Sequence, residues 1–148
     1  MSEDALREEV NLHASCVALG AENGLLIVGP SGSGKSALCL TLMALGARLV
    51  SDDRTLLKRD PDANYLTAEA PETIAGMIEA RGFGLLKSEC LSQVRLRGVV
   101  DMAQVETERL PPRREKALIG VSIPLFYRVD GPHFAPALIQ WLKGGRCA

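Results

Sequence analysis

The sequence lacks an excess of positive charge. Its 148 residues include 17 basic and 18 acidic side chains, which leave a formal net charge of −1. A protein that binds nucleic acid through the phosphate backbone normally carries a clear basic excess. The composition therefore predicts no dedicated binding to DNA or RNA.

Long hydrophobic runs and closely spaced cysteines are also missing. No apolar stretch approaches about 18–20 residues, the length of a membrane-spanning helix. The N-terminal segment MSEDALREEV is acidic, whereas a signal peptide begins with basic residues. The cysteines (Cys16, Cys39, Cys90 and Cys147) form no C-x-x-C pair and offer neither metal-ligand spacing nor a disulfide framework. These absences predict a cytoplasmic protein with reduced thiols and no membrane partner.

The composition that remains is typical of a soluble globular domain. Apolar residues make up 47% of the chain and charged residues 24%. A chain of this length suits one domain, so residues 1–148 are expected to form a single unit. Residues 1–9 are mostly charged and are expected to be frayed.

Hydrophobic patterning predicts an α/β fold with a mixed sheet. Alternating apolar residues predict one strand over residues 10–19, and Asn23-Gly24 predicts a hairpin turn into a buried strand over residues 25–28. An apolar helix is expected over residues 35–45. The remaining predicted elements are a strand at 48–50, a helix at 72–81, strands at 83–86 and 93–102, a loop at 107–116, a strand at 117–123 and a helix at 136–143.

A glycine-rich loop between a predicted strand and a predicted helix matches the pattern G-x-x-x-x-G-K-[ST]. Its residues are Gly29, Pro30, Ser31, Gly32, Ser33, Gly34, Lys35 and Ser36. The glycines let backbone N–H groups turn inward toward phosphate oxygens, and the helix N-terminus presents further donors to the same anion. In this pattern Lys35 reaches the terminal phosphates and Ser36 holds Mg²⁺. The loop therefore predicts a phosphate-binding P-loop for ATP and Mg²⁺.

Two adjacent carboxylates, Asp52 and Asp53, are expected to return to this loop. A ten-residue helix carries the chain about 15 Å away from the phosphates at 1.5 Å per residue. Five extended residues bring it back about 16 Å at 3.3 Å per residue. On an extended backbone the two side chains point to opposite faces. One carboxylate is therefore expected to accept a proton from a nucleophile, while the other holds metal-bound water or a neighbouring strand.

Two further residues are candidates on weaker grounds. Glu79 falls in the last turn of the predicted helix, where the helix dipole disfavours a carboxylate, and such local conflicts tend to mark functional sites. His13 lies on the polar face of the first predicted strand. In isolation, a solvated glutamate and a surface histidine are the simpler interpretations of both.

The catalytic C-terminal domain of the HPr kinase/phosphorylase family contains motifs similar to five segments of this chain. They are Leu12-His13, GPSGSGKS, LGARLVSDD, APETIAGMIEARGFGLL and Glu108-Arg109-Leu110-Pro111. The similarity extends from about residue 13 to residue 86, and more loosely to residue 124. The chain resembles the short form typical of α-proteobacteria. The resemblance implies a fold of the HPr kinase/PEP carboxykinase kind.

The resemblance also implies roles for individual residues. His13 corresponds to a histidine that flanks the catalytic acid. Asp53, or alternatively Asp52, corresponds to the group that accepts the serine proton. Glu79 corresponds to an acidic group near the metal. Arg109 corresponds to an arginine in a loop near the neighbouring active site.

By this resemblance, the chain is expected to phosphorylate a serine of HPr, or of its nitrogen-system homologue, with ATP and Mg²⁺. Family members assemble as ring-like homo-oligomers, which implies a hexamer here. The arginine-rich loop that the family uses for dephosphorylation is replaced by residues 125–130, so weak phosphorylase activity is expected. Two alternatives are a small-molecule P-loop kinase with residues 109–116 as its lid, and an ATP-binding sensor without turnover.

Overall fold

The computed structural model describes residues 9–60, 62 and 64–148. Its strands are β1 (Glu9–Leu12), β2 (Ala14–Ala18), β3 (Gly24–Val28), β4 (Arg48–Ser51), β5 (Thr55–Arg59), β6 (Leu66–Glu69), β7 (Met77–Ala80), β8 (Gly84–Lys87), β9 (Val94–Val105), β10 (Arg114–Leu118) and β11 (Val121–Arg128). Its helices are α2 (Lys35–Ala44), the 3-10 turn η1 (Glu72–Ile74) and α3 (Phe134–Gly144). Within these described residues, no helix is long and apolar enough to cross a membrane.

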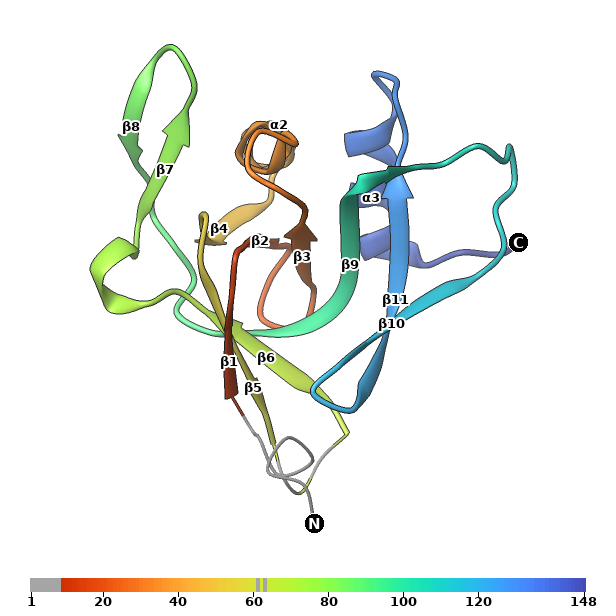
Figure 1. Cartoon of the computed structure of the whole chain (residues 1–148), viewed down its shortest axis with the longest axis horizontal. Helices are drawn as coiled ribbons and strands as arrows, with labels where there is room; N and C mark the ends of the chain where they lie inside the picture. Colours follow the sequence, from red (N-terminus) through yellow and green to blue (C-terminus); the bar gives the residue numbers. More distant parts are fainter. Residues whose placement is uncertain (1–8, 61, 63) are drawn as a thin grey trace.

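A nine-stranded mixed sheet forms the centre of the molecule (Figure 1). Its main path runs β1-β5-β6-β9-β3-β2-β4, and the β10–β11 hairpin joins it through β9. The helices α2 and α3 pack on one face over the first core cluster, which includes Leu25, Ile27 and Leu142. A second apolar cluster lies on the other face, toward β5 and β6. The structure confirms the predicted α/β fold with a mixed sheet and a packed P-loop helix.

The strand before the P-loop lies inside the sheet. β3 pairs antiparallel with β2 and parallel with β9, so both of its edges are hydrogen-bonded. Leu25, Leu26 and Ile27 are completely buried. The structure confirms the predicted β2–β3 hairpin, the α2 helix and the short strand β4. The loop that follows β3 thus starts from a fixed position.

The predicted single strand over residues 10–19 is wrong in one respect, because the chain bends at His13. Before the bend, β1 pairs with β5; after it, β2 pairs with β3 and β4. An uninterrupted strand cannot exchange its partners in this way. Regular alternation did not reveal the change, because it continues through the bend.

The predicted helix over residues 72–81 is also wrong. Only η1 is helical, and the chain then turns at Gly76, whose φ is +76°. The Ser88 N–H donates to the Gly76 carbonyl at 2.8 Å and closes the base of an antiparallel hairpin of β7 and β8. Ile78 is the buried residue of β7. Pro71 and Gly82 suggested helix ends, but Pro71 precedes η1 and Gly82 lies in the hairpin turn.

In the C-terminal third of the chain, residues 107–123 differ from the predicted loop and strand. A hairpin replaces the predicted single strand at 117–123: β10 and β11 pair across a turn at Ile119 and Gly120, which both have positive φ. β10 also takes up the end of the predicted loop. The predicted terminal helix is present as α3, and it packs closely on β9 because Gly98 leaves room for the Trp141 ring.

The cysteines of the described chain are all free thiols. Cys16 and Cys39 are buried in the core, whereas Cys147 is exposed. Burial raises the pKa of the Cys16 thiol to about 12, and it raises the pKa of Cys39 as well. Both buried thiols therefore remain protonated and act as small apolar core residues.

Candidate active site

One pocket of about 720 Å³ collects most of the predicted site residues. It opens where β3 and β4 end, beside the start of α2. Its lining residues are His13, Ser31, Gly32, Gly34, Lys35, Ser36, Ala37, Leu40, Asp53, Glu79, Ala80 and Arg81. The structure therefore brings the P-loop, the second aspartate, the histidine and the glutamate to one place.

The P-loop contains glycines in backbone conformations that other residues rarely adopt, and one of them also lacks room for a side chain. At Gly29, φ is +149°, and a Cβ would lie 2.6 Å from Ser33 Oγ and 3.0 Å from Met102 Cβ. At Gly34, φ is +97°, in the left-handed region that favours glycine. The backbone between them curls tightly enough for its N–H groups to face an anion.

Lys35 begins α2 and is largely buried. Its Nζ donates to the Gly29 carbonyl at 2.8 Å and to the Pro30 carbonyl at 3.0 Å. An ammonium group has three donor hydrogens, so a third remains for a phosphate oxygen. The positive charge is thereby held against the concave side of the loop.

Asp52 joins three elements through one buried carboxylate, which is 7% exposed. Its Oδ1 accepts hydrogen bonds from Ser15 Oγ at 2.8 Å and from Ser36 Oγ at 2.7 Å. Its Oδ2 accepts the Glu79 backbone N–H at 3.1 Å. These contacts tie β2, α2 and β7 together directly beneath the P-loop.

Asp53 lies in a different environment from its neighbour, as predicted, but the cause is a backbone turn and not an extended chain. Its side chain is 69% exposed, and its Oδ1 lies 2.8 Å from His13 Nε2. Its φ of +70° is in the left-handed region, which costs a non-glycine residue about 1–2 kcal/mol. Such strain is often found at functional sites. The backbone turn sends the two carboxylates in different directions.

Glu79 lines the pocket from β7, on a strand rather than in a helix. The helix-dipole argument that singled it out therefore does not apply, and its position instead follows from the hairpin next to Asp52. Its side chain is exposed at the pocket edge. Its predicted place near a metal remains a prediction.

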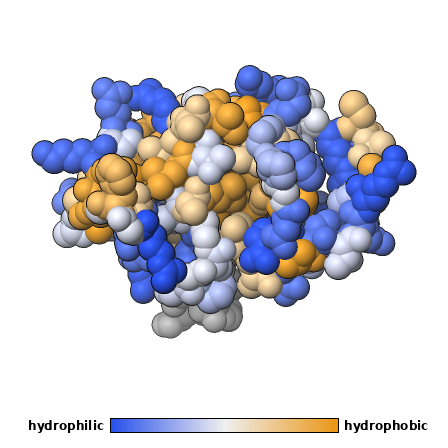
Figure 2. Space-filling model, turned by 90° about the horizontal axis from the view of Figure 1, so that it is seen from above, coloured by the Kyte–Doolittle hydropathy of each residue, from blue (hydrophilic) through white to orange (hydrophobic). Residues whose placement is uncertain are grey.

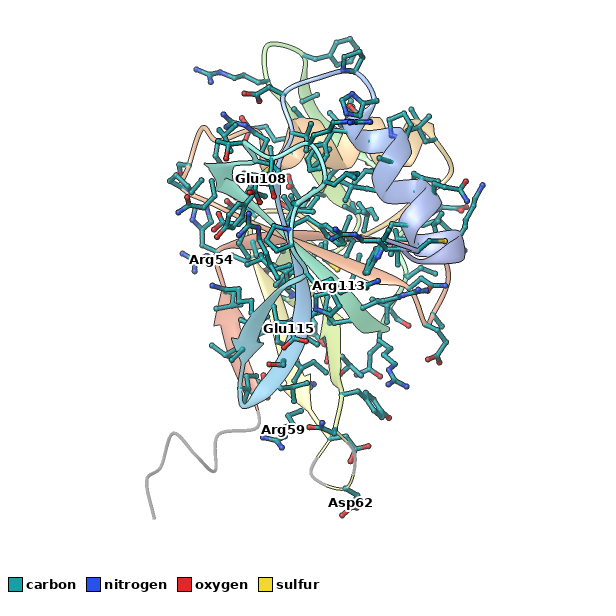
Figure 3. The ribbon with its side chains drawn as sticks, turned by 90° about the vertical axis from the view of Figure 1, so that its right-hand side faces the viewer. Arg54, Arg59, Asp62, Glu108, Arg113 and Glu115 are labelled. Atoms are coloured by element: carbon teal, nitrogen blue, oxygen red, sulfur yellow. The ribbon has the colours of Figure 1, made fainter. Side chains whose placement is uncertain are left out.

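Arg109 does not line the pocket in the part of the chain that the structure describes. It is exposed in the segment between β9 and β10, next to Glu108, which Figure 3 labels near the α2 end of the molecule. Glu106 anchors the start of this segment through hydrogen bonds from the Arg114 side chain. The Arg114 guanidinium holds the pKa of Glu106 below its usual range. The segment that carries Arg109 is therefore anchored at its start.

Sequence reasoning missed Ser15 as a site residue. Ser15 is completely buried; its Oγ donates to Asp52 and accepts the Asp53 backbone N–H at 3.1 Å. One hydroxyl thus sets the positions of both aspartates. Its only sequence signal was a polar residue in a short apolar strand. Arg81 lines the pocket from the hairpin, and the incorrect helix prediction placed it at a helix end.

The residues around Ser36 fit a bound Mg²⁺ ion and nucleotide. Ser36 Oγ and the Asp52 carboxylate are oxygen ligands of the kind Mg²⁺ prefers, usually together with phosphates and waters. Ser33 Oγ is buried in the P-loop without a hydrogen-bond partner among the described residues. A buried polar atom normally has a partner, so a phosphate oxygen is a suitable one. Among the residues that the structure describes, no group of three or more His, Cys, Asp or Glu side chains could hold a metal ion by itself.

Comparison with known proteins shows which family the chain belongs to. Residues 4–122 match the family model described as the HPr Serine kinase C-terminal domain. The chain belongs to this family. The match covers the P-loop, both aspartates, the β7–β8 hairpin and Arg109, and ends within β11.

Similar curated proteins are named HPr kinase/phosphorylase. The relative from Azoarcus sp. (strain BH72) is 35% identical over 133 residues, covering 80% of this chain and 42% of its own length. The relative from Aromatoleum aromaticum is 34% identical over 132 residues, covering 80% of this chain and 41% of its own. The chain thus spans about two fifths of the length of these relatives.

A solved structure confirms the fold. The HPr(Ser) kinase/phosphatase from Coxiella burnetii superposes with a TM-score of 0.71 at 24% identity. The superposition covers 90% of this chain and 88% of that chain. The predicted fold of the HPr kinase kind is confirmed at this level.

Replacing Lys35 with alanine is expected to weaken ATP–Mg²⁺ binding at least tenfold, because it removes the positive charge that the buried ammonium holds against the P-loop (about 1.4 kcal/mol per factor of ten). Isothermal titration calorimetry measures the affinity, and circular dichroism checks the fold. Lys143→Ala, at an exposed lysine of α3, is the matched control and is expected to bind normally. Unchanged binding by Lys35→Ala would contradict the P-loop assignment.

Proposed function

We propose that this chain transfers the γ-phosphoryl group of ATP to a serine of an HPr-like phosphocarrier protein. The supporting observation is the division of labour between adjacent aspartates at a P-loop. Asp52 is buried against Ser36, and Asp53 is exposed against His13. One carboxylate is thus available to the metal side of the nucleotide and the other to an incoming hydroxyl.

In this proposal Asp53 accepts the proton of the serine hydroxyl. The serine oxygen bonds to the γ-phosphorus, the bond to the β–γ bridging oxygen breaks, and ADP leaves with that electron pair. Asp53 is within hydrogen-bond distance of His13, whose ring holds the carboxylate in position. Phosphoryl transfer leaves little covalent work to the protein, so orientation is the main contribution of this pair.

The P-loop and its neighbours hold the nucleotide. Lys35 and the loop N–H groups neutralise charge on the β- and γ-phosphates. Ser36 and Asp52 would hold Mg²⁺, and Glu79 lies at the edge of the same pocket. When bound, Mg²⁺ supplies further neutralisation of charge on the phosphate oxygens.

The exposure of Asp53 favours a protein acceptor over a small-molecule acceptor. A small-molecule kinase normally encloses its substrate, which excludes water from the transfer. Here the carboxylate is 69% exposed and faces solvent beside the pocket. A serine on a protein surface can approach such a group directly. The other alternative, an ATP-binding sensor without turnover, would have no need for a positioned proton acceptor such as Asp53 beside His13.

The partner in this proposal is HPr or its nitrogen-system homologue, and the reaction takes place in the cytoplasm, where ATP is abundant. The names of the curated relatives support HPr as the acceptor class. The choice between the two carriers is decided by measuring phosphoserine formation on each with labelled ATP.

Asp53→Asn is expected to lower the rate of carrier phosphorylation by at least ~10²-fold, the scale for removing a general base. ATP binding is expected to survive, because Asp53 does not contact the P-loop in the structure. Single-turnover measurements at saturating ATP separate the two effects. Asp62→Asn is the control, since Asp62 is exposed at the opposite end of the molecule (Figure 3). Normal single-turnover chemistry with lost ATP binding would assign Asp53 to the nucleotide instead.

We also propose that phosphorolysis is slow relative to the kinase reaction. In phosphorolysis, an oxygen of inorganic phosphate attacks the phosphoserine phosphorus, which releases serine and forms pyrophosphate. This direction needs positive charge for a second phosphate, and the segment at residues 125–130 carries a single arginine. Arg128 is already held by Asp130 and the Met102 carbonyl.

Incubating phosphorylated carrier with excess inorganic phosphate is expected to release pyrophosphate much more slowly than the forward reaction phosphorylates the carrier. A coupled pyrophosphate assay gives the rate. The forward assay on the same preparation is the control for active enzyme. Pyrophosphate release as fast as carrier phosphorylation would contradict the expectation.

Finally, we propose a ring-like homo-oligomer, by family resemblance a hexamer, in which Arg109 acts at the neighbouring subunit's site. The segment around Arg109 is exposed and polar, and it does not reach its own pocket among the described residues. An arginine in this position can supply charge only if another subunit brings its pocket to it.

Mixing Arg109→Ala subunits with Asp53→Asn subunits is expected to restore carrier phosphorylation above the sum of the two inactive variants. In mixed oligomers, an intact Asp53 on one subunit meets an intact Arg109 from the next. Each variant mixed with itself is the control. No gain after subunit exchange, or a fully active wild-type monomer in analytical ultracentrifugation, would place Arg109 outside a shared site.

A further inference from the structure

The β7–β8 hairpin exposes large apolar side chains next to the pocket. Phe83 is 82% exposed and Leu85 is 65% exposed. Figure 1 shows the hairpin projecting from the body of the molecule beside α2, as a separate two-stranded sheet. In the view from above, hydrophobic residues gather at the left of the molecule, where this hairpin lies (Figure 2).

The fold itself does not need these two side chains. The hairpin is attached to the core through Ile78, which is 1% exposed, and through the half-buried Leu86. Burying a phenylalanine or leucine side chain is favourable by about 1.5–3 kcal/mol, and neither Phe83 nor Leu85 gains this in the isolated chain. Clustered exposed apolar residues mark interaction sites more often than single ones do.

The hairpin is continuous with the reaction pocket. Glu79, Ala80 and Arg81 line the pocket, and Phe83 follows two residues later at the turn. The exposed Asp53 carboxylate lies at the same opening. A protein that places a serine over Asp53 therefore comes within reach of the hairpin.

The charge of the hairpin gives the chemistry of the partner. Between residues 80 and 87 the only charged side chains are Arg81 and Lys87, and both are exposed. Neither forms an ion pair with another residue that the structure describes. Arg54, next to Asp53, is also exposed (Figure 3). A complementary surface has apolar side chains flanked by carboxylates.

We propose that the β7–β8 hairpin is the docking surface for the phosphocarrier, which binds Phe83 and Leu85 through apolar residues beside its acceptor serine. Nearby carboxylates of the carrier face Lys87 and Arg81. This inference rests on the proposed kinase function and names the contact that brings the acceptor to the pocket.

The test is the Phe83→Ser/Leu85→Ser double variant. It is expected to raise KM for the carrier at least tenfold, while kcat at saturating carrier and the affinity for ATP–Mg²⁺ remain within twofold of wild type. Both side chains are exposed, so the variant is expected to fold, and circular dichroism checks this. A role in supporting the fold of the pocket would instead change ATP affinity and kcat.

Two matched variants complete the design. Leu45→Ser changes an exposed leucine at the C-terminal end of α2, away from the P-loop, and is expected to leave KM unchanged. Lys87→Glu reverses the charge of the hairpin and is expected to raise KM for the carrier, with a smaller effect at high salt, where such interactions are screened. Lys143→Glu in α3 is its control.

Three outcomes overturn the inference, and they are distinct. An unchanged KM in the double variant, with wild-type phosphorylation intact, removes the docking surface but leaves the proposed function standing. Dissociation of the double variant in analytical ultracentrifugation would make the hairpin an interface between copies of the chain. A wild-type protein that phosphorylates neither HPr nor its nitrogen-system homologue removes the proposed function, and the docking surface with it.

Discussion

The buried carboxylate of Asp52 is the contact on which the arrangement of the site depends. It accepts hydrogen bonds from β2, from the first turn of α2 and from β7, three elements that are distant in sequence. Burying a carboxylate costs free energy unless its oxygens are hydrogen-bonded. The three donors therefore stabilise the buried Asp52 as well as linking the three elements. The P-loop helix, the strand with Ser15 and the hairpin are thereby held at one point.

This arrangement explains how two neighbouring residues of one type acquire different properties. Asp52 directly follows β4 and remains inside the protein, whereas Asp53 adopts a left-handed backbone conformation and turns outward. Ser15 fixes both, because its hydroxyl donates to one residue and accepts from the backbone of the other. In the proposed function, this difference in environment, rather than in residue type, would separate a metal-side carboxylate from a proton acceptor.

The same geometry relates the chemistry to the proposed partner. The pocket is closed by the P-loop on one side and remains open on the side of Asp53 and the β7–β8 hairpin. A phosphoryl donor fits the closed side, and a protein surface fits the open side. Binding energy from the exposed hairpin, remote from the reacting atoms, would then position the serine.

Local patterns in the sequence were enough to predict the strand–loop–helix of the P-loop, the return of the acidic pair and the α/β class, because these follow from periodicity and from distances along one short segment. The bend at His13, the β7–β8 hairpin in place of a helix, and the β10–β11 hairpin depend on tertiary contacts. In each case the chain exchanges partners or turns at a residue with positive φ, and hydrophobic periodicity does not register either event. Ser15 remained hidden for a related reason: its importance comes from two contacts with residues nearly forty positions away, which no local pattern records.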